Sequence, residues 1–386
     1  MANTHAVLSP SSAHRWSKCS ASIAMEAKCP ETTSSFAQEG TIAHRLLEEC
    51  LERDVDAMTL KGQKRYIDDR TFEVNDEMVH AVQLCLNYVR SFNGHITRET
   101  TFSLEAVTGE KDGQGTVDIV IDCGDVWHIV DFKYGAGVNV EASNNYQLIL
   151  YGLGVLNAWG DFLGEPQKVV LTIIQPRIRE QDPIKTWTLT PSELREWQQF
   201  FFTTGQEALK TKKLRTIPYT AYQPNTDVCR FCRAKARCPA VAKTVLIALE
   251  QPSKLLNNDE LAKVLDTLPL VESYVKAVKD EAFKALNNGE TLPNYTLKEG
   301  RKGNRTYKNE QEAEHILRRL FGDQAIKSVL ISPAEADKLA KSKNLNIQDI
   351  EELQNAVIRP EGKMQITREQ EELKQQADLA EFSKVA

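Results

Sequence analysis

The sequence has no apolar run of the ~18 residues that a membrane-spanning helix requires. Its opening segment, MANTHAVLSPSSAHRW, lacks the basic start and apolar stretch of a secretory signal, so we expect a cytosolic protein. Glycine and proline are few, 19 and 14 of 386 residues, and no internal repeat is visible. With 41% hydrophobic and 26% charged residues, the composition excludes a disordered, collagenous or disulfide-scaffold chain.

The chain also lacks the positive charge that usually marks a nucleic-acid-binding protein, because its net charge is −6. The charge is nevertheless segregated. The segment from residue 210 to residue 243 contains one acidic residue, Asp227. It contains nine basic residues: Lys210, Lys212, Lys213, Arg215, Arg230, Arg233, Lys235, Arg237 and Lys243. A local basic surface of this kind is suited to phosphates, and a solvated loop is an equally good interpretation.

The eight cysteines point away from disulfides and toward metal or redox chemistry in a cytosolic chain. We expect four of them to pack as small hydrophobic residues: Cys29, Cys50, Cys85 and Cys123. Three others form the tight set CRFCRAKARC within the basic stretch: Cys229, Cys232 and Cys238. Cys19 stands far upstream, in SSAHRWSKCS.

Hydrophobic periodicity predicts an α/β core over residues 1–245 and a helical C-terminal region over residues 246–386. Helices are expected at residues 9–28, 37–53, 74–92, 143–158, 191–212 and 259–286. Strands are expected at residues 95–107, 116–123, 126–135, 168–176 and 186–190, the first three forming an antiparallel meander joined by Gly/Asp turns.

Two carboxylates and a lysine stand on neighbouring strands of this meander. Asp118 lies in GTVDIVI, and Asp131 and Lys133 lie in IVDFKYG, with Phe132 directed to the opposite face. If the strands pair through the turn at residues 124–125, Asp118 lies beside Asp131. Two carboxylates with an adjacent lysine suit a divalent cation that polarises a phosphodiester, with the lysine orienting the nucleophile.

Taken alone, the two aspartates and the lysine fit the solvent-exposed face of an ordinary sheet at least as well as they fit a metal site. The surrounding residues favour a site, since the strands are apolar at nearly every position and charges that end buried strands need partners. Gln147 and Tyr151, four apart in NNYQLILYGL, share one face of the next helix. His44, in GTIAHRLLEE, is a third metal ligand only if its helix packs over the strand ends; otherwise it is a structural histidine.

The order of these motifs resembles that of RecB-like nucleases of the PD-(D/E)XK superfamily. The resemblance implies a restriction-endonuclease-like core, with a central mixed sheet flanked by helices. It assigns Mg²⁺ or Mn²⁺ to His44, Asp118, Asp131 and the backbone carbonyl of Phe132, and catalytic roles to Lys133, Gln147 and Tyr151. The proline of the superfamily name is absent here, because Val117 precedes Asp118.

The cysteines match the AddB-type and CRISPR-adaptation branches of that family. In those branches one N-terminal cysteine, in a helix opening S-P-S-S, joins three later ones spaced Cys-x₂-Cys-x₅-Cys. The resemblance therefore implies a [4Fe–4S] cluster, with zinc as the alternative, on Cys19, Cys229, Cys232 and Cys238. The segment EGRKGNRTYKN is similar to the tail of phage-encoded proteins with this core.

We therefore expect a metal-dependent DNA exonuclease acting on DNA ends in phage recombination or replication, in the bacterial host cytoplasm. A helicase or single-strand annealing protein is a possible partner, and no membrane is expected. Two alternatives stay open: a catalytically silent DNA-binding or recruitment subunit with the same fold, and a zinc-containing RNA-processing factor.

Overall fold

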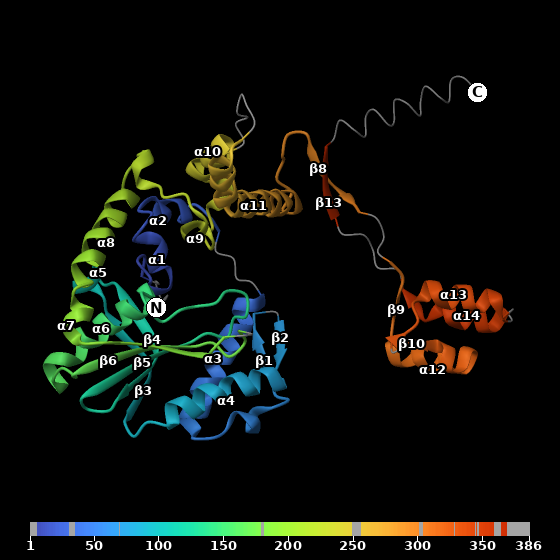
Figure 1. The fold of residues 1–386 in the computed structure, drawn as a ribbon, viewed down its shortest axis with the longest axis horizontal. Coiled ribbons are helices and arrows are strands. Elements are labelled where there is room, and N and C mark those ends of the chain that lie inside the picture. Colours follow the sequence, from blue (N-terminus) through green and yellow to red (C-terminus); the bar gives the residue numbers. More distant parts are fainter. Residues whose placement is uncertain are drawn as a thin grey trace. The chain divides into compact units, whose positions relative to one another are not determined.

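The computed structural model describes most of the chain (Figure 1). The described residues are 6–30, 35–68, 70–178, 181–248, 256–300, 304–327, 329–343, 345, 347–358 and 364–368. The chain divides into two compact units, Met1–Val275 and Lys276–Ala386. The compositional change at residue 245 falls near the end of α10 (Pro239–Ala248), and the domain boundary inferred from it stays a prediction.

A five-stranded mixed sheet forms the centre of the first unit, in the order β3-β4-β5-β6-β7. Its strands are β3 (His95–Ser103), β4 (Gln114–Asp122), β5 (Val126–Phe132), β6 (Lys168–Ile174) and β7 (Ile184–Leu189). All neighbouring pairs are antiparallel except β5 and β6, which are parallel. A parallel pair requires a crossover connection, and here α6 (Tyr146–Leu163) supplies it.

Helices bury both faces of the sheet, which explains why its inner strands are apolar at nearly every position. On one face α6 packs on residues such as Trp127 and Ile129, and α8 (Gln198–Lys212) adds residues to the same hydrophobic core. On the other face α3 (Ser35–Arg53) and α4 (Asp76–Arg90) pack on Ile119 and Phe132. This confirms the expected fold class, an α/β core with a central mixed sheet flanked by helices.

Several expected elements differ in detail from the structure. The helix expected at residues 9–28 is interrupted, with a 3₁₀ turn at Pro10–Ser12, then α1 (Ala13–Trp16) and α2 (Ala21–Glu26). At the end of α1, Ser17 Oγ donates to the carbonyl of Ala13 at 2.6 Å, and the backbone N–H of Ser17 bonds to the same carbonyl at 3.1 Å. The strand expected at residues 95–107 ends at Ser103, where α5 (Glu105–Thr108) begins.

Two further differences concern short elements. The helix expected at residues 191–212 is divided into α7 (Pro191–Arg195) and α8. A hairpin that was not expected, β1 (Lys64–Ile67) with β2 (Arg70–Glu73), precedes α4. Two short helices, α9 (Thr226–Cys229) and a 3₁₀ turn at Lys235–Arg237, lie within the cysteine-rich segment.

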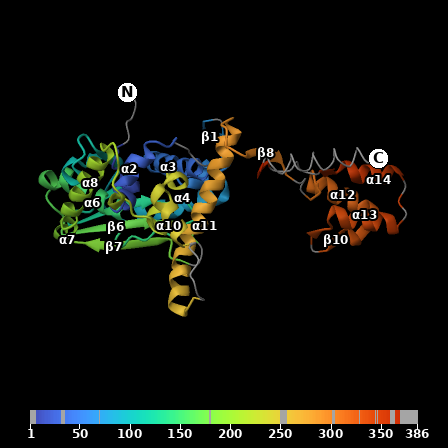
Figure 2. The same ribbon diagram turned by 90° about the horizontal axis from the view of Figure 1, so that it is seen from above.

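The second unit is mainly helical, as expected for the C-terminal region. The helix α11 (Asn258–Asn287), seen at full length in Figure 2, contains Pro269, and the sequence boundary between the two units falls within it. Beyond it α12 (Glu310–Phe321), α13 (Pro333–Ser342) and α14 (Ile347–Asn355) enclose a small core that includes Leu317 and Phe321.

Pairs of short strands accompany these helices, and β8 (Tyr295–Glu299) with β13 (Met364–Arg368) is the longest of those described in the second unit. Two-residue pairs are formed by β9 (Thr306–Tyr307) with β12 (Val357–Ile358) and by β10 (Ile326–Lys327) with β11 (Val329–Leu330). The described part of the chain contains no helix both long enough and apolar enough to cross a bilayer.

Candidate functional site

Three carboxylates lie in one row across the strands β3, β4 and β5. The register pairs Arg98 with Ile119 and Thr100 with Val117, so Glu99 stands opposite Asp118. The next pair of strands aligns Ile119 with Val130, and one step further Asp118 stands opposite Asp131. Like charges directly opposite each other destabilise a sheet, so this row requires compensation by cations.

Asp118 is held by the backbone and by a histidine. Its Oδ2 accepts the N–H of Phe132 at 2.8 Å and lies 3.3 Å from Nε2 of His44, which α3 brings over this end of the sheet. Nδ1 of His44 donates to the carbonyl of Gly40 at 2.8 Å. That bond fixes the ring orientation and directs Nε2 toward the carboxylate.

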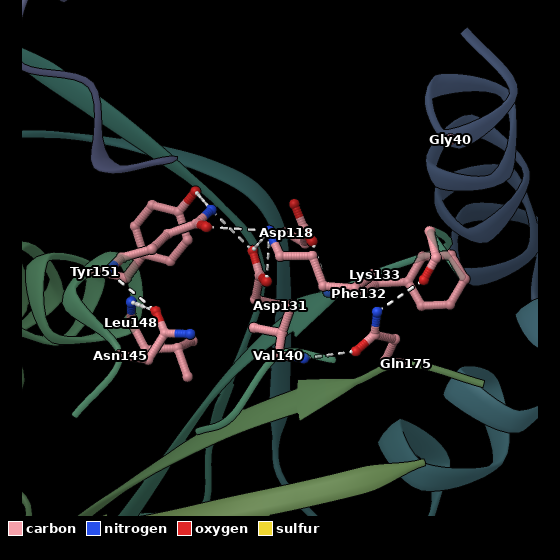
Figure 3. Close-up of polar contacts among 12 residues, drawn as sticks. Gly40, Asp118, Asp131, Phe132, Lys133, Val140, Asn145, Leu148, Tyr151 and Gln175 are labelled. Carbon is pink, nitrogen blue, oxygen red and sulfur yellow. Dashed lines mark hydrogen bonds and ion pairs between the residues drawn. The ribbon is translucent and has the colours of Figure 1, made fainter. Parts of the chain in front are cut away.

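Asp131, Lys133 and Gln147 form one hydrogen-bonded unit. Figure 3 shows Asp131 and Lys133 beside Asp118. Nζ of Lys133 lies 2.8 Å from Asp131 Oδ2 and 3.1 Å from Oδ1, and it donates to Gln147 Oε1 at 3.0 Å. The amide nitrogen of Gln147 donates to Asp131 Oδ1 at 3.0 Å and to the Tyr151 hydroxyl at 2.8 Å. Asp131 is buried, whereas 28% of the Lys133 side chain is exposed.

The helix α6 is positioned by its first residues. Asn145 caps it, accepting the backbone N–H groups of Gln147 and Leu148 at 3.1 and 3.2 Å. Gln147 lies in the first turn of α6, so the cap fixes the position from which the Gln147 side-chain amide bonds to Lys133. Tyr151, one turn later, is buried and stacks edge-on against Phe102.

The charges at the site are strongly coupled. Burial alone lowers the pKa of His44, but the hydrogen bond and charge of Asp118 raise it to about 9. Burial raises the pKa of Asp118, yet His44 and then Lys133 outweigh it and hold that pKa below its usual value. Asp131 behaves oppositely: burial raises its pKa in spite of Lys133. Two carboxylates whose pKa values are pushed apart are typical of functional sites.

The donor types suit a hard cation, since one imidazole and two carboxylates lie together. As the side chains stand, no group of three or more His, Cys, Asp or Glu residues in the described ranges is arranged to hold a metal ion. The carboxylates already have partners, because the ammonium of Lys133 pairs with Asp131 and the imidazole of His44 pairs with Asp118. Metal binding here would therefore require these side chains to move.

The structure brings the other four predicted ligands together as well. A cavity of about 20 Å³ is lined by Cys19, Cys229, Cys232 and Cys238, with Arg15 and Tyr222 beside them. None of the eight cysteines is in a disulfide. Burial, followed by the charge of Glu26, raises the pKa of Cys232 to about 12, so this thiol is protonated without a metal. The volume is that of about one water, and either an iron–sulfur cluster or zinc requires the thiols to turn.

The remaining cysteines lie elsewhere. Cys50 and Cys85 are buried in the core between the sheet and the helices α3 and α4, and Cys123 packs at its margin. Cys29 is half-buried after α2.

Sequence reasoning missed two residues near the site. Glu99 has a left-handed backbone (φ 43°), and partial burial, together with the charge of Asp118, raises its pKa to about 7. Its position opposite Asp118 follows only from the strand register. Gln175, just after β6, is 3% exposed and bonds to the connection that follows Lys133. A buried polar residue at the end of an apolar strand was the available signal.

Comparison with known proteins gives a family for the chain. The family described as "Protein of unknown function (DUF2800)" matches residues 5–374, nearly the whole sequence. The chain belongs to the DUF2800 family. Among solved structures, the crystal structure of SSO0001 matches with 14% sequence identity and a TM-score of 0.25, covering 51% of this DUF2800 chain and 82% of that one.

Proposed function

We propose that this chain is a metal-dependent deoxyribonuclease of the RecB-like type, hydrolysing phosphodiester bonds at DNA ends as a Mg²⁺- or Mn²⁺-dependent exonuclease. The observation that carries the proposal is the hydrogen-bonded unit of Asp131, Lys133 and Gln147 beside Asp118. A half-buried lysine that is paired with a buried carboxylate and bonded to an amide is held in one place, whereas ordinary surface lysines are free to move.

His44 Nε2, Asp118, Asp131 and the carbonyl of Phe132 would hold the metal. When bound, the ion polarises the phosphate and lowers the pKa of a water ligand. The backbone bond from Phe132 to Asp118 keeps that carboxylate directed into the site. The bond from His44 to Gly40 does the same for the imidazole.

Lys133 then acts on the nucleophile and the phosphate. Burial lowers its pKa, but the charges of Asp131 and Asp118 outweigh this and raise the pKa, so the amine stays charged. A fixed ammonium counters negative charge that develops on the phosphate during attack. Gln147 orients Lys133 and Asp131 through the bonds described above, and the buried Tyr151 hydroxyl fixes the amide of Gln147 in turn.

We further propose that the four cysteines around the shared cavity bind a [4Fe–4S] cluster, with zinc as the alternative. Support comes from their convergence: Cys19 and Cys229 stand 210 positions apart in the sequence yet line the same cavity. Such a site would join the N-terminal segment to the end of the core.

The nuclease proposal is tested with end-labelled linear and circular DNA in Mg²⁺, Mn²⁺ and EDTA. We expect linear DNA to be degraded from its ends in either metal and left intact in EDTA. Asp118→Asn and Asp131→Asn should lower cleavage by at least about a hundredfold, since metal ligation is lost. Cleavage is compared per folded molecule, because each substitution also removes the buried carboxylate that pairs with His44 or with Lys133 and should lower the melting temperature.

The matched control is Asp161→Asn, which removes one exposed carboxylate from α6. This variant should cut like the wild type. Wild-type cleavage by Asp118→Asn would refute the assigned site. A wild-type chain that binds DNA in Mg²⁺ but never cuts it would instead identify the silent DNA-binding alternative.

A further inference from the structure

Glu26 is a buried carboxylate that the proposed cleavage does not use. It is 6% exposed and is the last residue of α2. A carboxylate is unfavourable at the C-terminal end of a helix, where the backbone dipole is negative, and a buried charge is costly unless it is paired. Neither the helix nor the hydrophobic core therefore explains an acidic residue at this position, and the explanation lies in the groups that it contacts.

Glu26 connects two segments that are far apart in the sequence. Its Oε2 accepts the Nε–H of Arg15 in α1 at 3.0 Å, and its Oε1 accepts the backbone N–H of Arg233 at 2.9 Å. Arg233 directly follows Cys232 and stands 207 positions after Glu26. The second bond therefore fastens the loop between Cys232 and Cys238 to the N-terminal segment. In agreement, α1 lies beside α9, which opens the cysteine-rich segment (Figure 1).

Arg15 belongs to the other half of the cysteine set. Its backbone carbonyl accepts the N–H of Cys19 at 2.8 Å, and its side chain, 17% exposed, lines the cysteine cavity. A guanidinium carries five N–H donors, and the bond to Glu26 uses one of them. A single carboxylate thus holds a cation beside the cavity and also holds a loop between two of the predicted ligands.

A positive charge beside four cysteines suits the group proposed to bind there. Four thiolates leave a bound zinc ion or [4Fe–4S] cluster with net negative charge, which a nearby cation stabilises. The cavity lining contains a second basic residue, Lys235, which donates to the carbonyl of Arg230 at 3.1 Å and to Ser273 Oγ at 2.6 Å. Arg15 differs from it in being bonded to the residue that fastens the two halves of the cysteine set together.

We propose that Glu26 and Arg15 are positioning residues for the metal or cluster bound by the four cysteines. Glu26 fastens the Cys232–Cys238 loop to the segment that carries Cys19, and it holds the guanidinium of Arg15 beside the cavity. The inference rests on the cysteine site of the proposed function and adds to it the residues that hold its two halves together.

The first experiment measures zinc affinity in the full-length chain, produced in zinc-supplemented, iron-depleted medium. Zn²⁺ alone is the probe, because it forms four-thiolate sites without cluster assembly, and a chromophoric chelator competes for it. We expect Glu26→Gln and Arg15→Gln each to weaken zinc binding by at least about tenfold, as the loss of groups that orient metal ligands usually does. The double variant should lose little more than either single one, because the two residues act through one contact.

The matched control is Glu49→Gln. Glu49 is also a partly buried carboxylate with two arginine partners, each at 2.6 Å, but it lies in α3 and outside the lining of the cysteine cavity. Its loss should lower the melting temperature and leave zinc affinity at the wild-type level. Arg15→Gln retains the bond from Arg233 to Glu26, so it tests the proposal independently if Glu26→Gln does not fold.

The second experiment separates the charge of Arg15 from a merely structural role. The full-length chain is reconstituted anaerobically with iron and sulfide, and its reduction potential is measured. Arg15→Gln should make the potential more negative, because a neighbouring positive charge favours the reduced cluster, and Arg15→Lys should stay close to the wild type. The same order is expected for zinc affinity, with Arg15→Lys between the wild type and Arg15→Gln. A structural role alone would lower cluster content without moving the potential.

The outcomes distinguish this inference from the site on which it rests. Wild-type zinc affinity in both Glu26→Gln and Arg15→Gln would refute the positioning role and leave the cysteine site standing. An equal loss of zinc affinity in Glu49→Gln would assign the effect to general stability and would also refute it. A wild-type chain that binds neither zinc nor a cluster would overturn the cysteine site and this inference together. DNA cleavage is a separate measurement, and its result bears on the nuclease proposal alone.

Discussion

Glu99 adds a third carboxylate to the site, and its effect on stability depends on its repulsion with the neighbouring carboxylates. It stands opposite Asp118 in the strand register, and Asp118 stands opposite Asp131, so the three carboxylates repel one another across neighbouring strands. Lys133 and His44 compensate Asp131 and Asp118. Glu99 is exposed and contributes repulsion that solvent only partly screens.

Replacing Glu99 with Gln should therefore stabilise the metal-free protein. We expect a gain of roughly a few tenths of a kcal/mol in the free energy of unfolding at low salt, after allowing for solvent screening. The gain should shrink at high salt, because added ions screen the repulsion between the exposed Glu99 carboxylate and its neighbours. Urea denaturation at two salt concentrations measures it. Glu207→Gln, an exposed position on α8, is the control, and an equal gain there would contradict a local origin.

At the scale of elements, α6 and α4 are both capped by an asparagine, but their first turns have different roles. Asn145 accepts the N–H groups of Gln147 and Leu148, and Asn75 accepts that of Met78 at 2.9 Å. Each cap satisfies donors that the helix itself leaves unpaired. Only the first turn of α6 carries a residue bonded to Lys133 and Asp131.

These two caps make a matched pair for mutation. Asn145→Ala and Asn75→Ala should each cost about 1 kcal/mol of stability, as loss of an N-cap usually does. Only Asn145→Ala should also reduce cleavage per folded molecule, because Gln147 loses its fixed position. Chemical denaturation and single-turnover cleavage are the two measurements. Equal cleavage by both variants would show that the amide does not depend on its cap.

The sequence predicted most of the elements that hold the site, for physical reasons that differ between them. The alternating and apolar runs of β4 and β5 and the helical period of α3 and α6 are strong local signals, so His44, Asp118, Asp131 and Gln147 could be placed on their elements. The position of Glu99 opposite Asp118 depends on the exact register of β3 on β4, and that of Gln175 depends on the parallel pairing of β6 with β5. These alignments join distant segments, and the local pattern of a single strand does not specify them.

At the scale of the whole molecule, the cysteine cavity joins segments that the entire sheet separates in sequence. It receives Cys19 from the N-terminal segment and the other three cysteines from the segment after α8. Closing so long a loop restricts the unfolded chain strongly. If a metal or cluster binds there, its binding free energy adds to folding free energy.

Serine substitutions of all eight cysteines should therefore divide into two classes. Changes at Cys19, Cys229, Cys232 or Cys238 should lower bound metal, solubility and melting temperature together. Changes at Cys29 or Cys123 should have small effects on metal content and melting temperature. Changes at Cys50 or Cys85 should lower the melting temperature only by the cost of burying a hydroxyl group. Iron, sulfide and zinc analysis with thermal melting tests this and separates cluster from zinc. Full metal content in Cys19→Ser would remove that residue from the ligand set.

The pairing of Asp118 with His44 and of Asp131 with Lys133 has one more consequence. Because the hydrogen bond and charge of Asp118 raise the pKa of His44 to about 9, this imidazole stays protonated at neutral pH, and Asp118 and Asp131 each have a basic partner before any ion arrives. The sheet can therefore fold around its carboxylates without waiting for a divalent cation. If the proposed nuclease function holds, a newly made molecule would be folded but inactive, and its activity would begin with the supply of metal rather than with folding.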